Sequence, residues 1–156
     1  MTQYLTFNLD EEIFALEISR IHEVLEFTSV TPVPRTPSFM RGVINLRGNV
    51  VPVVDLKRQF GMAETEMSVS ACVIIIEMKV DGEQTILGAL ADSVQEVMDL
   101  EPEQIGPPPK IGSRLKTEFI RGMGRHDEKF IIILDIDRIF SDEELIAVSA
   151  STPSGI

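Results

Sequence analysis

The 156-residue chain has little of several residue types, and each shortage excludes a kind of function. A single cysteine, Cys72, rules out an internal disulfide, and two histidines are too few for a Cys/His cage around a metal. Tryptophan is absent and tyrosine occurs once, which counts against a site for an oligosaccharide or another small ligand. We therefore expect a protein that uses neither a metal nor a cofactor.

Basic residues are also scarce. The 14 lysines and arginines face 25 acidic residues, and the net charge of −11 repels phosphate backbones and anionic membrane surfaces. The longest apolar run, residues 71–76, has the length of a strand, and residues 1–5 lack the basic stretch and apolar core of a signal peptide. We expect a cytoplasmic protein that binds neither nucleic acid nor, directly, a membrane.

Strands dominate the pattern that is present. Valine and isoleucine make up about a fifth of the chain, and both are enriched in strands. Alternating or apolar runs separated by short polar turns predict three hairpins, formed by residues 4–9 with 13–18, 43–46 with 50–56, and 72–80 with 85–90. Residues 130–134 read as a further buried strand. Pro52 lies inside one run and predicts an edge strand or a bulge there.

Helical signals are few. Ser141 followed by Glu144 matches a capping box, and apolar residues follow it, so we predict one helix near the C-terminus. Residues 151–156 are small and polar and are predicted to form a flexible tail. Residues 106–109, Gly-Pro-Pro-Pro, are predicted to form an extended loop.

An internal repeat with an offset of 80 residues is the most informative feature. Residues 39–60 align without a gap on residues 119–140. The identical pairs are Phe39 and Phe119, Arg41 and Arg121, Gly42 and Gly122, Asp55 and Asp135, Arg58 and Arg138, and Phe60 and Phe140. The predicted hairpins before each copy match as well. Gly42 and Gly122 are expected to adopt a positive φ where a short helix stops.

The repeat and the strands together predict the fold. Two copies are too few for a solenoid, and five strands suffice to curl a sheet and remove its edges. We therefore predict a mainly β protein of two small five-stranded barrels with a short C-terminal helix. One domain is expected over residues 1–150, with approximate repeat halves 3–60 and 71–140.

Catalytic motifs are lacking. The sequence has no phosphate-binding glycine loop and no Gly-x-Ser-x-Gly elbow, and His22-Glu23 is not followed by the second histidine of a metalloprotease. Asp55 and Asp135 each end an apolar strand, so capping of a short helix explains both. Cys72 is interpreted as a small buried hydrophobe. These observations favour a protein that is not an enzyme.

The two copies differ at a hairpin tip, and positions that differ are free to serve a partner. Residues 45–49, with Arg47, are replaced by the charged residues 125–128 in the second copy. Solvated turns explain both tips equally well.

A second candidate surface is apolar. Ile18, Ile21 and Val24 are spaced by three, and Val94 and Val97 have the same spacing in the second half. From the pattern alone, core packing is the favoured explanation for them.

The central stretch resembles a known family. Residues 41–56, RGVINLRGNVVPVVDL, together with Pro32-Val33-Pro34, Pro37 and Phe39 before them, resemble the signature of the chemotaxis coupling proteins, the CheW-like domains. The resemblance continues through residues 88–97, 103–105, 107–109 and 130–135 and covers nearly the whole chain. Cys72 stands where an aliphatic residue is common in the family, a difference of little physical consequence.

The resemblance implies two SH3-like five-stranded β-barrel subdomains around a shared hydrophobic groove. It also implies a standalone cytoplasmic adaptor, recruited to membrane receptor arrays. Such an adaptor joins the cytoplasmic tip of methyl-accepting chemotaxis receptors to the regulatory domain of a CheA-type histidine kinase. An adaptor of a related pathway, for surface motility or second-messenger output, is the nearest alternative, and a small-ligand-binding barrel is a more distant one.

The resemblance also implies roles for individual residues. The receptor groove would be lined by Ile18, Ile21, Val24, Val94 and Val97, with Glu23 and Arg47 as polar determinants nearby. The kinase-facing surface would lie around Asn45, Leu46, Gly48 and Asn49. For the five apolar residues, this resemblance favours a partner surface over core packing.

Overall fold

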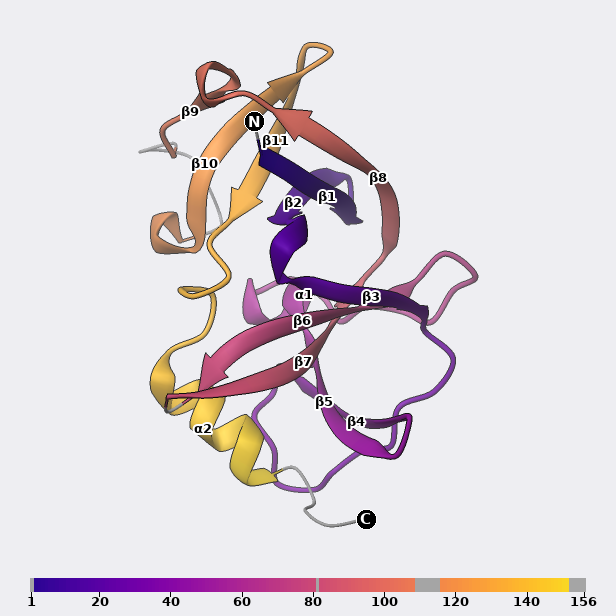
Figure 1. Ribbon diagram of the computed structural model, residues 1–156. Helices are drawn as coiled ribbons and strands as arrows, with labels where there is room; N and C mark the ends of the chain where they lie inside the picture. Colours follow the sequence, from indigo (N-terminus) through magenta and orange to yellow (C-terminus); the bar gives the residue numbers. More distant parts are fainter. Residues whose placement is uncertain (1, 81, 109–115, 152–156) are drawn as a thin grey trace.

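A computed structural model describes residues 2–80, 82–108 and 116–151 of the chain (Figure 1). The strands are β1 (Thr2–Leu9), β2 (Glu12–Glu17), β3 (Ile21–Glu26), β4 (Met40–Leu46), β5 (Asn49–Asp55), β6 (Cys72–Val80), β7 (Glu83–Ala91), β8 (Ser93–Leu100), β9 (Ile105–Gly106), β10 (Ile120–His126) and β11 (Lys129–Leu134). The α-helices are α1 (Leu56–Gln59) and α2 (Asp142–Ser151), and 3₁₀ turns occur at η1 (Ile18–Arg20), η2 (Pro102–Gln104) and η3 (Thr117–Phe119).

The predicted C-terminal helix is present and begins as expected. The Ser141 hydroxyl accepts a hydrogen bond from the Glu144 amide at 3.1 Å, and the Glu144 carboxylate accepts one from the Ser141 amide at 2.8 Å. This reciprocal pair is a capping box, and it satisfies amides that the first turn leaves free. Leu145 and Val148 then point into the core. Residues 152–156 of the predicted tail and Pro109 of the predicted loop lie outside the described residues.

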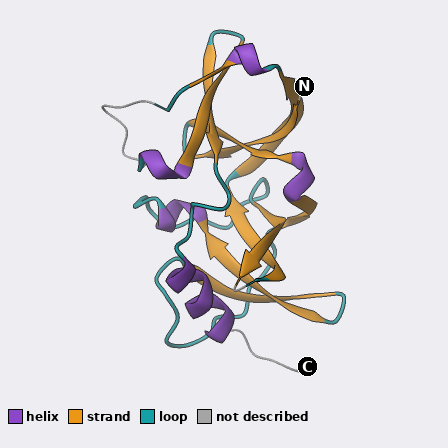
Figure 2. Cartoon of the chain, turned by 60° about the vertical axis from the view of Figure 1, so that its left-hand side comes forward, coloured by secondary structure: helices purple, strands orange, loops and turns teal. Residues whose placement is uncertain are grey.

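The strands form two sheets. One has six strands in the order β8-β1-β2-β11-β10-β9, and the other has five in the order β3-β6-β7-β5-β4. The six-stranded sheet is uppermost in Figure 2 and curls strongly, and helix α2 lies beside the lower, five-stranded sheet. The fold is therefore mainly β with two sheets and one short C-terminal helix.

The repeat is visible in the geometry of both copies. The Asp55 amide donates to the Phe39 carbonyl at 2.7 Å, and the Asp135 amide donates to the Phe119 carbonyl at 2.8 Å. Each pair β4–β5 and β10–β11 has one irregularity in register, directly before the repeated glycine. The copies are thus alike in backbone as well as in sequence.

The two copies exchange their hairpins. Hairpin β1–β2 pairs through β2 with β11 of the second copy, and hairpin β6–β7 pairs through β7 with β5 of the first copy. Likewise β8 pairs with β1, and β3 pairs with β6. Each sheet therefore contains strands from both halves, and neither half contains a complete sheet.

This exchange corrects the prediction that each repeat half forms a five-stranded barrel of its own. One sheet has six strands rather than five, and the halves 3–60 and 71–140 do not coincide with the sheets. The physical reason is that the two hairpins have the same local pattern. A hairpin from either copy presents the same kind of edge and apolar face, so the sequence repeat leaves the choice of partner open.

One core joins the two sheets, and each sheet also has a small cluster of its own. In β6, Ile74 and Ile76 belong to the shared core, whereas Val73 and Ile75 pack in the cluster of the five-stranded sheet. Successive strand residues face opposite sides, so β6 is buried on both faces, which explains its continuous apolar run. The smaller clusters lie within the individual sheets, around Val53 in one and Ile131 in the other.

Aromatic rings cross the shared core. The rings of Phe7 and Phe14, on β1 and β2, have centroids 6.1 Å apart. The ring centroids of Phe14 and Phe60 are 6.0 Å apart, and those of Phe60 and Phe119 are 5.7 Å apart. Because Phe60 follows α1 and Phe119 ends η3, this row of rings links elements of both copies.

Pro52 predicts an edge strand or a bulge, and of these two alternatives the edge strand is wrong. Pro52 lies in β5, which has β4 on one side and β7 on the other. Pro52 is opposite Val43 of β4, and the parallel pairing with β7 begins only at Val53, which is opposite Gly88. The missing amide of Pro52 therefore falls outside the ladder with β7, and an interior strand tolerates it.

Gly42 and Gly122 require glycine for different reasons. Gly42 has a φ of +151°, as predicted, and a Cβ there would lie 2.2 Å from the Thr31 carbonyl oxygen. Thr31 is the residue that bridges to Val43 after β3 has ended. Gly122 has no positive φ, which corrects the prediction, but a Cβ on it would lie 2.7 Å from an Ile105 methyl group. Both glycines lie in strands rather than at helix ends.

We expect Gly42→Ala to lower the free energy of unfolding by more than about 2 kcal/mol, because it combines a strained φ with a backbone clash. Gly61→Ala is the matched control, since Gly61 has a φ of +80° but no atom within 4 Å of the added Cβ. Chemical denaturation measures both variants. Equal losses for the two would show that the approach of Thr31 contributes nothing.

Candidate interaction site

The apolar residues assigned to a receptor groove lie on η1 and on one outer strand of each sheet. Ile18 is in η1, Ile21 is in β3, and Val94 is in β8; all three are partly buried against the shared core. Val24 on β3 is 41% exposed, and Val97 on β8 is 48% exposed. Core packing therefore explains part of the burial of Ile18, Ile21 and Val94, whereas Val24 and Val97 are available to a partner.

These residues belong to a second repeat that the sequence analysis missed. Residues 21–27, IHEVLEF, align with residues 94–100, VQEVMDL, at an offset of 73. Each segment is the third strand of its copy, and each has a register irregularity near its start. Val24 and Val97 are therefore equivalent positions, and Glu96 is the equivalent of Glu23. The offset of 73 was the signal that could have identified Glu96.

Glu23 and Arg47 form an ion pair across the five-stranded sheet. The Arg47 guanidinium donates to both carboxylate oxygens of Glu23, with 3.3 Å between Nη1 and Oε1. Glu23 is on β3 and Arg47 is at the β4–β5 tip, so the pair joins elements from opposite ends of the strand order. The hydrogen bonds from Arg47 hold the pKa of the Glu23 carboxyl below its ordinary value.

The hairpin tip carries the residues assigned to the kinase. Arg47 and Gly48 have φ values of +50° and +87°, as a two-residue turn of type I′ requires. The Asn45 side-chain oxygen accepts a hydrogen bond from the Gly48 amide at 2.8 Å. Asn49 is exposed, and Leu46 packs partly against the cluster of its sheet. Asn45 and Gly48 thus shape the turn, and Arg47 and Asn49 are exposed on it.

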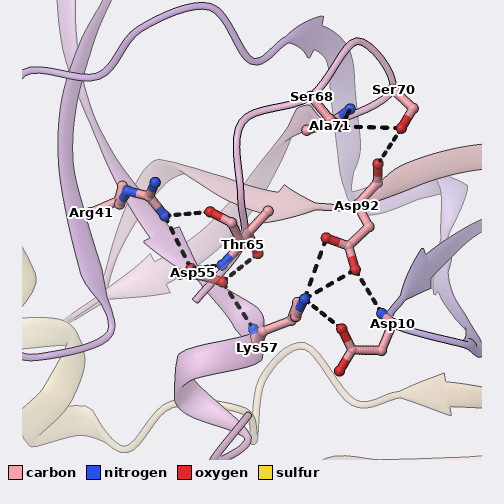
Figure 3. A network of polar contacts seen from close by, with 9 residues as sticks. All are labelled: Asp10, Arg41, Asp55, Lys57, Thr65, Ser68, Ser70, Ala71 and Asp92. Carbon is pink, nitrogen blue, oxygen red and sulfur yellow. Dashed lines mark hydrogen bonds and ion pairs between the residues drawn. The ribbon is translucent and has the colours of Figure 1, made fainter. Parts of the chain in front are cut away.

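A partly buried polar network links the two sheets (Figure 3). The Lys57 ammonium, 8% exposed, lies 2.5 Å from Asp10 in the β1–β2 turn and 3.3 Å from Asp92 between β7 and β8. Burial by itself lowers the pKa of Lys57, but hydrogen bonds to both aspartates outweigh it and raise this pKa above its ordinary value. The role of Lys57 was not predicted from the sequence, because nothing in the local pattern around Lys57 distinguishes it from a solvated lysine.

Asp55 belongs to the same region and does more than cap a helix. Its carboxylate accepts from the Lys57 amide at 3.1 Å, which confirms the predicted capping of α1. It also accepts from the Thr65 amide and hydroxyl at 2.7 Å each, and from Arg41 at 3.3 Å. The repeat equivalent, Asp135, accepts a hydrogen bond from the Asp137 amide and forms an ion pair with Arg138. Residues 136–138 form a turn rather than a helix, so the predicted capping of a helix by Asp135 is wrong.

Cys72 is a packing residue, and the described residues contain neither a metal site nor a membrane-spanning helix. Cys72 is buried, and this burial raises the pKa of its thiol to about 11, as befits a packing residue. Within residues 2–80, 82–108 and 116–151, no group of three or more His, Cys, Asp or Glu side chains could hold a metal ion. Over the same ranges, no helix is long and apolar enough to cross a membrane.

The fold and these surfaces define an interaction module of two intertwined sheets, and comparison with known proteins specifies its class. A family model described as the CheW-like domain matches residues 3–144, so the chain belongs to the CheW family. It is therefore a coupling adaptor of chemotaxis signalling, in a family of scaffolds that link receptors to the kinase CheA.

Individual relatives agree with this assignment. A chemotaxis protein CheW of Klebsiella aerogenes is 33% identical over 146 residues, covering 94% of this chain and 86% of the relative. A probable chemotaxis protein CheW of Rhizobium etli is 30% identical over 142 residues, covering 91% and 89%. The crystal structure of the scaffolding protein TtCheW from Thermoanaerobacter tengcongensis superposes with a TM-score of 0.79 at 36% identity, covering 90% and 88%.

Proposed function

We propose that this chain binds the cytoplasmic tip of a methyl-accepting chemotaxis receptor on one surface and the regulatory domain of a CheA-type histidine kinase on another. It would act without catalysis, in the cytoplasm, at membrane receptor arrays. Each curled sheet would correspond to an SH3-like barrel. In the five-stranded sheet, the bridge between Thr31 and Val43 supports this view, because it brings the chain after β3 against β4.

The receptor surface would comprise η1 and the edge strands β3 and β8. A receptor tip is a helical hairpin, and an amphipathic helix binds by laying apolar side chains into an apolar groove. Val24 and Val97 are exposed, whereas Ile18, Ile21 and Val94 are partly buried beside the shared core. These residues offer exposed apolar area that is held in place by side chains packed on the core.

The kinase surface would be the β4–β5 tip, with Asn45, Leu46, Gly48 and Asn49. The ion pair between Glu23 and Arg47 is the observation that supports coupling between the two surfaces. It connects a strand of the receptor surface directly with the tip that faces the kinase. A receptor that changes its contacts with Glu23 or Arg47 changes the position of the tip. Only contacts that differ between the active and inactive states of the kinase can shift the equilibrium between those states.

Two sets of variants test the separation of the surfaces. Val24→Asp with Val97→Asp should weaken binding to a soluble receptor fragment by at least about tenfold while binding to the kinase regulatory domain is unchanged, because charges replace an apolar anchor. Asn49→Arg should do the reverse. Isothermal titration with each partner measures both, and Ile146→Asp, the same kind of apolar-to-charged change at a half-exposed position on α2, is the control. Loss of both partners in either variant would refute two separate surfaces.

A further inference from the structure

A cavity in the six-stranded sheet lies where its β10–β11 tip approaches β8. It has a volume of about 140 Å³, and its apolar lining comes from Ile13, Met98 and Ile131. Sites for small-molecule ligands typically span about 300–1,000 Å³, so this cavity suits the end of one long side chain rather than a metabolite. Three of its lining residues, Gln95, Glu96 and Met98, are on β8, the strand that also carries Val94 and Val97 of the proposed receptor surface.

Most of the polar lining residues are ionisable. They are Glu96, Asp127, His126 and Lys129, and the uncharged Gln95 completes the polar lining. The His126 ring nitrogen Nε2 lies 3.3 Å from the Asp127 carboxylate. Within the described ranges, the carboxylate of Glu96 forms no hydrogen bond or ion pair, although its backbone is bonded to Thr6 on β1. Glu96 is therefore the group that a ligand would find free.

The five-stranded sheet has an equivalent pair of positions, and there a cation, Arg47, binds the glutamate. Glu96 is the repeat equivalent of Glu23, at the offset of 73, and Asp127 is the equivalent of Arg47, at the offset of 80. Arg47 and Asp127 also share a φ of +50° in their turns. In the five-stranded sheet, the Arg47 guanidinium occupies the gap between strand and tip and binds Glu23. In the six-stranded sheet, an aspartate stands in its place.

We propose that this cavity binds an arginine side chain of a partner protein, which takes the position that Arg47 occupies in the other half. The guanidinium would bind Glu96 and Asp127, and its aliphatic stem would lie along Ile13 and Met98. A planar guanidinium matches a carboxylate through two hydrogen bonds, as the internal pair already does. The site adjoins the proposed receptor surface on β8, but the observations on which it rests concern neither receptor nor kinase.

Lys129 limits the strength of the site and provides a test of it. Lys129 lines the same cavity, and among the described residues its ammonium forms no ion pair with either carboxylate. A cation at this place repels an incoming guanidinium and competes for Glu96. Removing the charge at Lys129 should therefore strengthen binding, whereas removing the charge at Glu96 should weaken it.

The experiment is a titration of the isotope-labelled full chain with the peptide acetyl-Gly-Arg-Gly-amide, followed by NMR of the backbone amides. Saturable shifts should centre on Gln95, Glu96, Met98 and His126. Glu96→Gln should weaken the affinity about two- to fivefold, and Lys129→Gln should strengthen it, as for a partly exposed ion pair. The same peptide with citrulline, which has the shape of arginine but no charge, should bind more weakly by a similar factor.

Asp127→Arg gives a second and independent test. Arginine is compatible with this turn position, because Arg47 adopts the same φ in the other copy, so the variant should fold. Its side chain should fill the cavity, pair with Glu96 and abolish the peptide-induced shifts, whereas Asp127→Asn should only weaken them. The proposal is overturned if shifts at these amides are absent, or equal for citrulline, or unchanged by Glu96→Gln.

Discussion

Separated fragments 1–66 and 67–156 are expected to be unfolded, each without a cooperative thermal transition. The reason is the exchange of hairpins between the repeat copies. In fragment 1–66, β2 loses β11, β3 loses β6 and β5 loses β7, so only two isolated hairpins remain. An isolated hairpin is marginally stable at best in water. The shared core loses partners from both halves at the same time.

Cleavage of the folded protein is the matched control for this prediction. The segment around Met67 and Val69 is highly exposed, so a protease site inserted between Glu66 and Met67 should be cut without unfolding. The nicked protein should retain a cooperative melt, because every strand keeps its partners, and mixing the separated fragments should restore that melt. Circular dichroism and NMR measure these states. A dispersed NMR spectrum from fragment 67–156 alone would contradict the exchanged pairing.

The sequence predicted the individual elements better than their partners. The three hairpins, the strand near residue 130 and the C-terminal helix follow from local signals, namely turn residues, alternation and a capping box. Strands β3 and β8 were not predicted, because their sequences, IHEVLE and SVQEVMDL, lack the apolar density of the buried strands. Pairing depends on long-range packing, which a repeat of similar hairpins leaves undetermined.

The candidate site was predicted in part for a related reason. The internal repeat identified the tip as a place where the copies differ, and the family resemblance identified Glu23 and Arg47, which the structure brings together. The role of Lys57 was not predictable, since its partners Asp10 and Asp92 are 47 and 35 residues away in sequence and meet it only across the two sheets. The sequence indicated a candidate apolar surface but not the repeat equivalence within it, which relates Ile21 to Val94 and Val24 to Val97.

Arg47→Glu is expected to reduce receptor-dependent kinase activation by at least about tenfold, because attraction between Arg47 and a carboxylate of the partner becomes repulsion. Stability should stay close to that of the wild type, since the ion pair with Glu23 is exposed. The turn should tolerate glutamate, because Asp127 and Glu128 occupy the equivalent turn with positive φ. Kinase assays in reconstituted receptor complexes, alongside thermal melts, measure the two effects. Arg58→Glu, an exposed arginine on α1, is the control with the same change in net charge.

The charge-swapped double variant, Glu23→Arg with Arg47→Glu, distinguishes an internal brace from a partner contact. The swap restores an ion pair between β3 and the tip, so a brace that only holds the tip in position would recover its function. A receptor that recognises the two charges meets them in reversed places, and attraction to Arg47 becomes repulsion. We expect wild-type stability and activation still at least about tenfold below wild type. Recovery of activation in the swapped protein would show that Glu23 and Arg47 position the hairpin and contact no partner.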